Sequence, residues 1–222
     1  MNMWTPEVTN MIIQGIGETL KMTCFSCLFG YLFGIPLGVI LSTTDVNGLT
    51  PNRYVYKVLD FITNIVRSVP FLILLILLIP VTRALVGKSY GSTATIVPLT
   101  IAAVPFIGRM VESSLNEVDR GVIEAARSMG ISNFKIITRV MLVETRVSLM
   151  TGVTIAFGTI LGYSAMAGTV GGGGLGDIAV RYGYYRYQTD IMIVTVVLLI
   201  LLVQIFQTVG MRIAAKTDRR IK

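Results

Sequence analysis

Histidine is absent from this chain of 222 residues, and charged residues are scarce. Without an imidazole, the chain lacks the commonest general base, the Ser-His-Asp triad and most kinds of zinc site. The two cysteines, Cys24 and Cys27, lie inside an apolar segment, which excludes a disulfide-stabilised secreted scaffold. Charged residues make up 14% of the chain, against about a quarter in a typical soluble domain, and hydrophobic residues make up 53%. This balance indicates a helical membrane protein.

Charges are missing from five long stretches, and a hydrocarbon core of about 30 Å is crossed by roughly 20 helical residues. We therefore expect five spanning helices in one transmembrane domain, residues 1–222, at about 19–41, 61–81, 94–111, 147–168 and 191–211. Pro70 and Pro80 interrupt the second segment and are expected to kink it. The fourth segment carries Gly152, Gly158 and Gly162, which favour close packing between helices.

Basic residues outside these segments are distributed unevenly. The connecting regions 43–60 and 112–146 and the tail 212–222 hold twelve Lys and Arg, whereas the other two loops hold four. By the positive-inside rule, the richer side is cytoplasmic. The N-terminus is then predicted outside the plasma (inner) membrane and the C-terminal tail inside, so the net charge of +7 is a topology signal and not a nucleic-acid footprint.

The loop 112–146 is predicted to form two short helices. Asp119 is expected to cap the first helix, Gly130 to end it, and Ser132 to cap the second. Composition alone favours an amphipathic segment lying on lipid headgroups. A DNA-binding helix-turn-helix is disfavoured, because a loop fixed between two membrane spans can hardly enter a major groove.

A third interpretation comes from resemblance. Glu124-Ala125-Ala126, followed by Gly130, Val140 and Leu142, resembles the "EAA" signature of permease subunits in binding-protein-dependent ABC importers, although Val143 stands where that signature has proline. Further motifs, at 67–71, 97–100, 105–112 and 162–168, are similar to methionine-import permeases, and the resemblance covers about 15–212.

The resemblance implies a type I importer permease fold, in which a homodimer works with two cytoplasmic ATPases and an external methionine-binding lipoprotein. ATP and magnesium would then belong to the ATPase, with no cofactor, metal or catalytic residue in this chain. The loop would couple the ATPase to transport, a role that the resemblance gives to Glu124, Ala125, Ala126, Arg127 and Gly130.

Two glycine-containing motifs have non-catalytic interpretations. Gly171, Gly173 and Gly176 satisfy G-x-G-x-x-G, but no predicted strand precedes them, and we interpret the segment as a flexible external turn. Gly87-Lys88-Ser89 lacks the upstream glycine of a phosphate-binding loop. We therefore expect this chain to be a transport subunit and not an enzyme.

Several polar and adaptable residues are candidates for the translocation path. Tyr163, Ser164 and Met166 end the fourth segment, and the flexible thioether of Met166 could act as a gate, although core packing remains an alternative. Arg67 could snorkel to the interface or pair with Asp60 or Glu112.

The resemblance implies methionine import, of the D- or L-enantiomer or both, by alternating access. The alternatives are an ABC permease for another amino acid, and, from other classes, a secondary transporter or a membrane scaffold.

Arg109 and Glu112, three residues apart, are expected to form a local ion pair.

Overall fold

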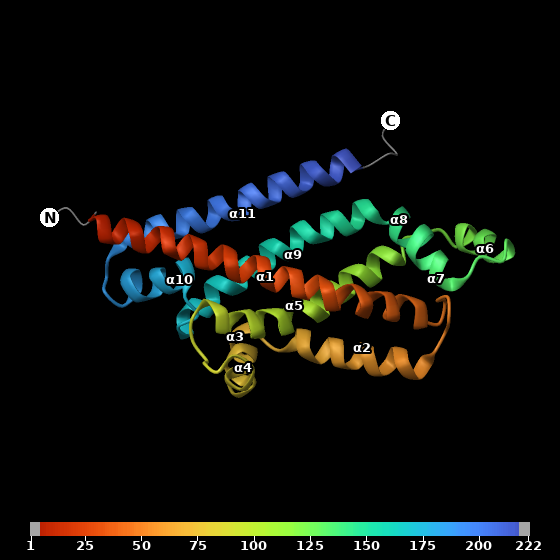
Figure 1. Ribbon diagram of the computed structural model, residues 1–222, viewed down its shortest axis with the longest axis horizontal. Helices are drawn as coiled ribbons and strands as arrows, with labels where there is room; N and C mark the ends of the chain where they lie inside the picture. Colours follow the sequence, from red (N-terminus) through yellow and green to blue (C-terminus); the bar gives the residue numbers. More distant parts are fainter. Residues whose placement is uncertain (1–4, 218–222) are drawn as a thin grey trace.

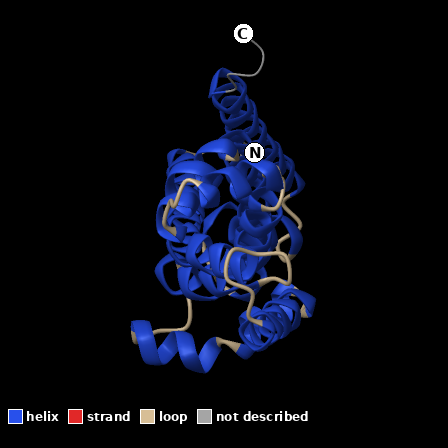
Figure 2. Cartoon of the chain, turned by 90° about the vertical axis from the view of Figure 1, so that its right-hand side faces the viewer, coloured by secondary structure: helices blue, strands red, loops and turns tan. Residues whose placement is uncertain are grey.

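The computed structural model describes residues 5–217, and every regular element in that range is a helix (Figures 1 and 2). Four helical stretches in it are long and apolar enough to cross a membrane, or five if the bent pair α2 and α3 counts as one span. The expected all-α fold is confirmed. Residues 218–222 of the expected C-terminal tail lie outside the described range.

The long helices run along the long axis of the molecule (Figure 1). They are α1 (Pro6–Thr44), α5 (Ser92–Leu115), α9 (Arg146–Ala167) and α11 (Thr189–Thr217). Helix α1 starts well before the expected residue 19, because Thr5 caps it and Pro6 occupies its first turn, where proline is tolerated. At 39 residues, it is almost twice as long as the roughly 30 Å of hydrocarbon requires.

The second expected segment is not one kinked helix, and this prediction was wrong. Helix α2 (Arg53–Ser68) ends before Pro70, and α3 (Phe71–Leu77) leaves at 103° to it. Val69 between them is extended, with φ −78° and ψ 126°, because a residue before proline disfavours the helical conformation. Pro80 lies in the first turn of a separate helix, α4 (Ile79–Val86), where it breaks nothing.

Helices α1 and α5 pack through a stripe of glycines on α1. A Cβ atom added to Gly30, Gly34 or Gly38 would lie within 3.0 Å of Ala103, Ile107 or Val111 side-chain atoms on α5. Spacing of four residues places the three glycines on one helix face, so the two backbones approach closely. On α9, a Cβ at Gly152 or Gly158 would lie 3.1–3.2 Å from the Met110 or Gln207 side chain, as close packing predicts. A Cβ at Gly162 would meet nothing within 4 Å among residues 5–217, so the expected packing role of that glycine is not seen there.

The glycine-rich segment after α9 is a packed turn and not the flexible one expected. It joins a 3₁₀ turn (Gly168–Val170), α10 (Gly174–Ile178) and a π-helical turn (Ala179–Tyr184). The Glu18 carboxylate accepts a hydrogen bond from the Gly174 N–H at 2.8 Å, and the Thr19 hydroxyl accepts one from Leu175 at 2.9 Å. These bonds tie the turn to α1.

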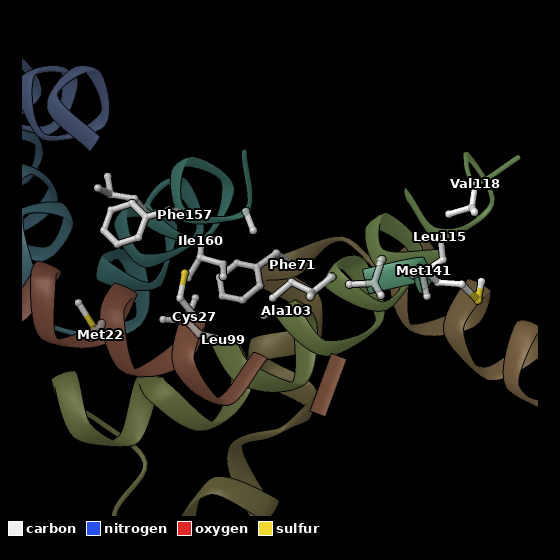
Figure 3. Packing of buried hydrophobic residues seen from close by; sticks show 14 of the residues in the cluster. Met22, Cys27, Phe71, Leu99, Ala103, Leu115, Val118, Met141, Phe157 and Ile160 are labelled. Atoms are coloured by element: carbon white, nitrogen blue, oxygen red, sulfur yellow. The ribbon is translucent and has the colours of Figure 1, made fainter. Parts of the chain in front are cut away.

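A continuous apolar core connects the membrane helices to the loop after α5. Figure 3 shows Met22, Leu99, Phe157 and Ile160 in one part of this core, with Leu115, Val118 and Met141 in another. The loop between α5 and α9 is therefore packed onto the bundle, and it is built from α6 (Arg120–Ser128), α7 (Asn133–Lys135), a π-helical segment (Ile136–Met141) and α8 (Leu142–Glu144).

Candidate coupling surface and translocation path

Helices α6 and α7 project from the end of the molecule opposite to the start of α1, and we call residues 119–135 the knob (Figure 1). The Asp119 side chain accepts a hydrogen bond from the Gly121 N–H at 2.7 Å and so caps α6. This confirms the start of the first helix predicted from the sequence.

Helix α6 ends in a Schellman turn centred on Gly130. The Ile131 N–H donates to the Ala126 carbonyl at 3.2 Å, and the Gly130 N–H donates to that of Arg127 at 2.9 Å. Gly130 has φ +72°, the left-handed conformation that glycine adopts without a steric penalty. The prediction that Gly130 ends the helix is confirmed.

The second helix of the knob differs from its prediction. Ser132 occupies the N-cap position of α7, but its hydroxyl makes no capping hydrogen bond. Helix α7 has only three residues before the chain adopts π-helical geometry at 136–141. The i→i+5 spacing of a π turn brings residues five apart toward one side, and Ile136 and Met141 are both buried.

The predicted coupling residues divide between the inside and the outside of the knob. Ala126 is 3% exposed and packs in the core cluster with Leu49 and Ile136. The Arg127 guanidinium donates to the Leu49 carbonyl, which ties α6 to the loop after α1. Glu124 also lines a pocket of about 270 Å³ between these two segments.

The outer surface of the knob presents Glu124, Ala125 and Gly130. It also exposes Met129 and Phe134, at 71% and 76%, on either side of the Gly130 turn. Met129 and Phe134 are large apolar residues in the most charged loop of the chain, which is a signal visible in the sequence. A rigid turn flanked by exposed apolar side chains is suited to docking in a groove of another protein.

The three candidate path residues do not converge on one point within the chain. The Tyr163 ring stacks on Phe71 of α3, with centroids 4.5 Å apart. Ser164 is buried, and its hydroxyl donates to the Leu161 carbonyl at 2.7 Å. Met166 is 51% exposed. Their role in the path therefore stays a prediction.

An ion-pair network joins α2 to α5. Arg109 contacts Glu112 at 2.7 Å, which confirms the expected local pair. Its guanidinium also contacts Asp60 and donates to the side-chain oxygen Oδ1 of Asn64 at 3.1 Å. The suggested pairing of Arg67 with Asp60 or Glu112 is not seen, because Arg109 takes both carboxylates.

Bundled apolar helices with a packed, projecting knob define an integral, multi-pass membrane component. The chain belongs to the family of binding-protein-dependent transport system inner membrane components, whose family model matches residues 34–222. It is thus an inner-membrane permease component.

Individual relatives resemble the chain over most of its length. It is 48% identical to the probable D-methionine transport system permease protein MetI of Vibrio cholerae, over 98% of this chain and 96% of that protein. Identity to the protein of the same name from Pasteurella multocida is 40%, over 97% and 100% of the two chains. The MetNI methionine ABC transporter, solved in inward-facing conformations, contains a chain 44% identical with a TM-score of 0.95, over 97% of this chain and 100% of that one.

Proposed function

We propose that this chain is the permease subunit of an ATP-driven importer that moves methionine, as the D- or L-enantiomer or both, into the cytoplasm by alternating access. The names of the relatives support methionine as the substrate, and the chain matches nearly the full length of two of them. The close likeness to a chain of the MetNI transporter supports the mechanism. A permease for another amino acid is the nearest alternative.

The permease works as a homodimer with two cytoplasmic ATPase subunits and an external methionine-binding lipoprotein. The exposed outer surface of the knob is the observation that carries the ATPase assignment. Glu124, Met129 and Phe134 lie on that surface, while buried Ala126 and the Arg127 bond to Leu49 hold the knob against the bundle. ATP and magnesium are bound by the ATPase.

The knob faces the cytoplasm, and the N-terminus lies outside. The start of α1 is at the opposite end of the bundle from the knob, consistent with this orientation (Figure 1). The twelve-to-four distribution of basic residues supports the same direction.

A secondary transporter or a scaffold is less well supported. A proton-driven carrier needs titratable groups free to change charge along the path. Here the Asp60 and Glu112 carboxylates are both paired with Arg109. A scaffold would not need a rigid projecting knob.

Co-purification of the ATPase with tagged permease tests the coupling assignment. Phe134→Asp removes an exposed apolar anchor and should weaken the association about 30-fold, the equivalent of about 2 kcal/mol for a hot-spot residue. Leu85→Asp is the matched control, because Leu85 is 69% exposed but lies on α4, away from the knob. If the knob only rests on lipid headgroups, Phe134→Asp will retain as much ATPase as Leu85→Asp.

A further inference from the structure

Arg67 is an exposed cation near the end of α2, two residues before the break at Val69. Arg109 has two carboxylate partners, whereas no hydrogen bond or ion pair joins Arg67 to another residue within 5–217. Arg67 is therefore free to bind an anion or water, since none of residues 5–217 pairs with it.

A pocket of about 330 Å³ lies beside Arg67, between α2, α5 and α9. It extends along α5 from Phe106 to Ser114, about 12 Å of helix, and ends near Glu117. Glu117 precedes the knob, so the pocket leads from the side carrying the knob toward Arg67. Its volume falls within the range of about 300–1,000 Å³ that is usual for small-ligand sites.

The walls of this pocket combine apolar and polar groups, and besides Arg67 they include Arg109, whose guanidinium is paired with Asp60 and Glu112. Phe106, Met110 and Ile155 supply an apolar surface. Hydroxyl groups line the same space, and the Glu117 carboxylate accepts a hydrogen bond from Ser148 at 3.0 Å. An unpaired guanidinium, an apolar wall and oxygen acceptors complement a carboxylate, an apolar side chain and an ammonium group, respectively.

We propose that this pocket is a substrate site of the permease itself, in which Arg67 binds the carboxylate of an amino acid whose apolar side chain packs on Phe106, Met110 and Ile155. The proposal rests on the proposed function and refines it: the permease, in addition to the external binding protein, contacts the substrate. Arg67 is the specificity-determining residue, because an uncharged analogue leaves the guanidinium unpaired.

Protection of a cysteine in the pocket tests this proposal. Ser113 is exposed and lines the pocket, so Ser113→Cys on a Cys24→Ser, Cys27→Ser background leaves this chain one thiol, whose labelling is read on the permease subunit. The permease–ATPase complex is reconstituted without binding protein, and the labelling rate by a hydrophilic thiol reagent is measured against methionine concentration. Methioninol, which has a hydroxymethyl group in place of the carboxylate, is the ligand control.

We expect methionine to slow the labelling and methioninol not to. In Arg67→Gln, the methionine concentration for half-protection should rise at least about tenfold, equivalent to 1.4 kcal/mol. Arg67→Lys keeps the charge and should give a smaller rise, and Arg53→Gln, an exposed arginine on α2 outside the pocket, should give none. If Arg67→Gln fails to assemble, Arg67→Lys and methioninol still test the site.

Three results would overturn the proposal: equal protection by methioninol, an unchanged half-protection concentration in Arg67→Gln, or no protection up to the solubility limit of methionine.

Vesicles of phosphatidylcholine with and without phosphatidylglycerol form a further arm of the experiment. Slower labelling that depends on the anionic lipid, and not on methionine, would assign Arg67 to a headgroup and also overturn it. ATP-dependent methionine uptake by the same Ser113→Cys protein with its binding protein separates the two claims: uptake without protection rejects the pocket alone, whereas no methionine uptake counts against the proposed function.

Discussion

Gly130 offers a sharp test of the knob, because its environment isolates one energetic effect. A Cβ atom added there would meet nothing within 4 Å, so substitution creates no clash with another residue. The cost comes from the backbone at φ +72°, where an ordinary L-residue loses about 1–2 kcal/mol. Valine, which is branched at Cβ, should lie at the upper end of that range, and asparagine, which tolerates left-handed conformations, well below it.

A loss of about 1–2 kcal/mol lowers the population of the correct turn about 5- to 30-fold relative to its alternatives. Gly130→Val should therefore misorient Met129 and Phe134, which flank the turn, and reduce ATPase co-purification and ATP-driven uptake by up to that factor at limiting ATPase. Gly130→Asn should retain most of both activities, and both variants should insert in the membrane normally, because the knob lies outside the spanning helices. Normal coupling in Gly130→Val, or equal losses in both variants, would refute the reasoning.

Three further predictions concern the bundle and the path. Gly34→Leu should lower the free energy of unfolding of the permease in detergent by about 1–3 kcal/mol through overpacking against α5. Gly17→Leu, whose Cβ meets nothing within 4 Å, should not lower it, and equal effects would contradict the packing of α1 on α5. Asp60→Asn removes a partner of the network between α2 and α5 and should cost about 1–3 kcal/mol in the same assay, with Lys57→Gln, an exposed change on the same helix, as control. Met166→Ala should raise basal ATP turnover of the reconstituted complex if Met166 is a gate; unchanged turnover and uptake would assign it to packing.

Much of the architecture could be predicted from hydrophobic segments and helix-end signals. Uncharged stretches near α5, α9 and α11 locate those helices to within a few residues, apart from the longer end of α11. Asp119 and Gly130 mark the ends of α6, because N-caps and left-handed turns depend on local chemistry that the sequence states directly.

Other features could not be predicted, either because they depend on tertiary contacts or because a hydropathy threshold places a helix end wrongly. The start of α1 was predicted too late because charged residues such as Glu7 and Glu18 lie in its first turns, and only the uncharged stretch was counted. A helix can continue well beyond the membrane. The 103° break at Pro70 could not be told from a kink, since both begin with the same missing N–H. Gly30, Gly34 and Gly38 were visible as a small-residue repeat, but only the structure shows that α5 lies against it.

Which of the predicted coupling residues are buried and which are exposed also could not be predicted from the sequence. Ala126 belongs to the same motif as Glu124, yet it is buried in the core cluster with Leu49, and the exposed Arg127 also donates a hydrogen bond to the Leu49 carbonyl. Only the structure shows that Met129 and Phe134 are exposed on either side of the Gly130 turn.

The most direct test of the central claim is methionine uptake into vesicles that contain this chain, its ATPase and the binding lipoprotein. ATP is supplied on the side that carries the knob, and labelled methionine with its binding protein on the other. We predict that methionine accumulates on the ATP side, against its gradient, and that accumulation stops without ATP or in a permease lacking residues 119–135. Accumulation driven by an ion gradient without ATP, or an ATP-driven complex that does not move methionine, would contradict the claim.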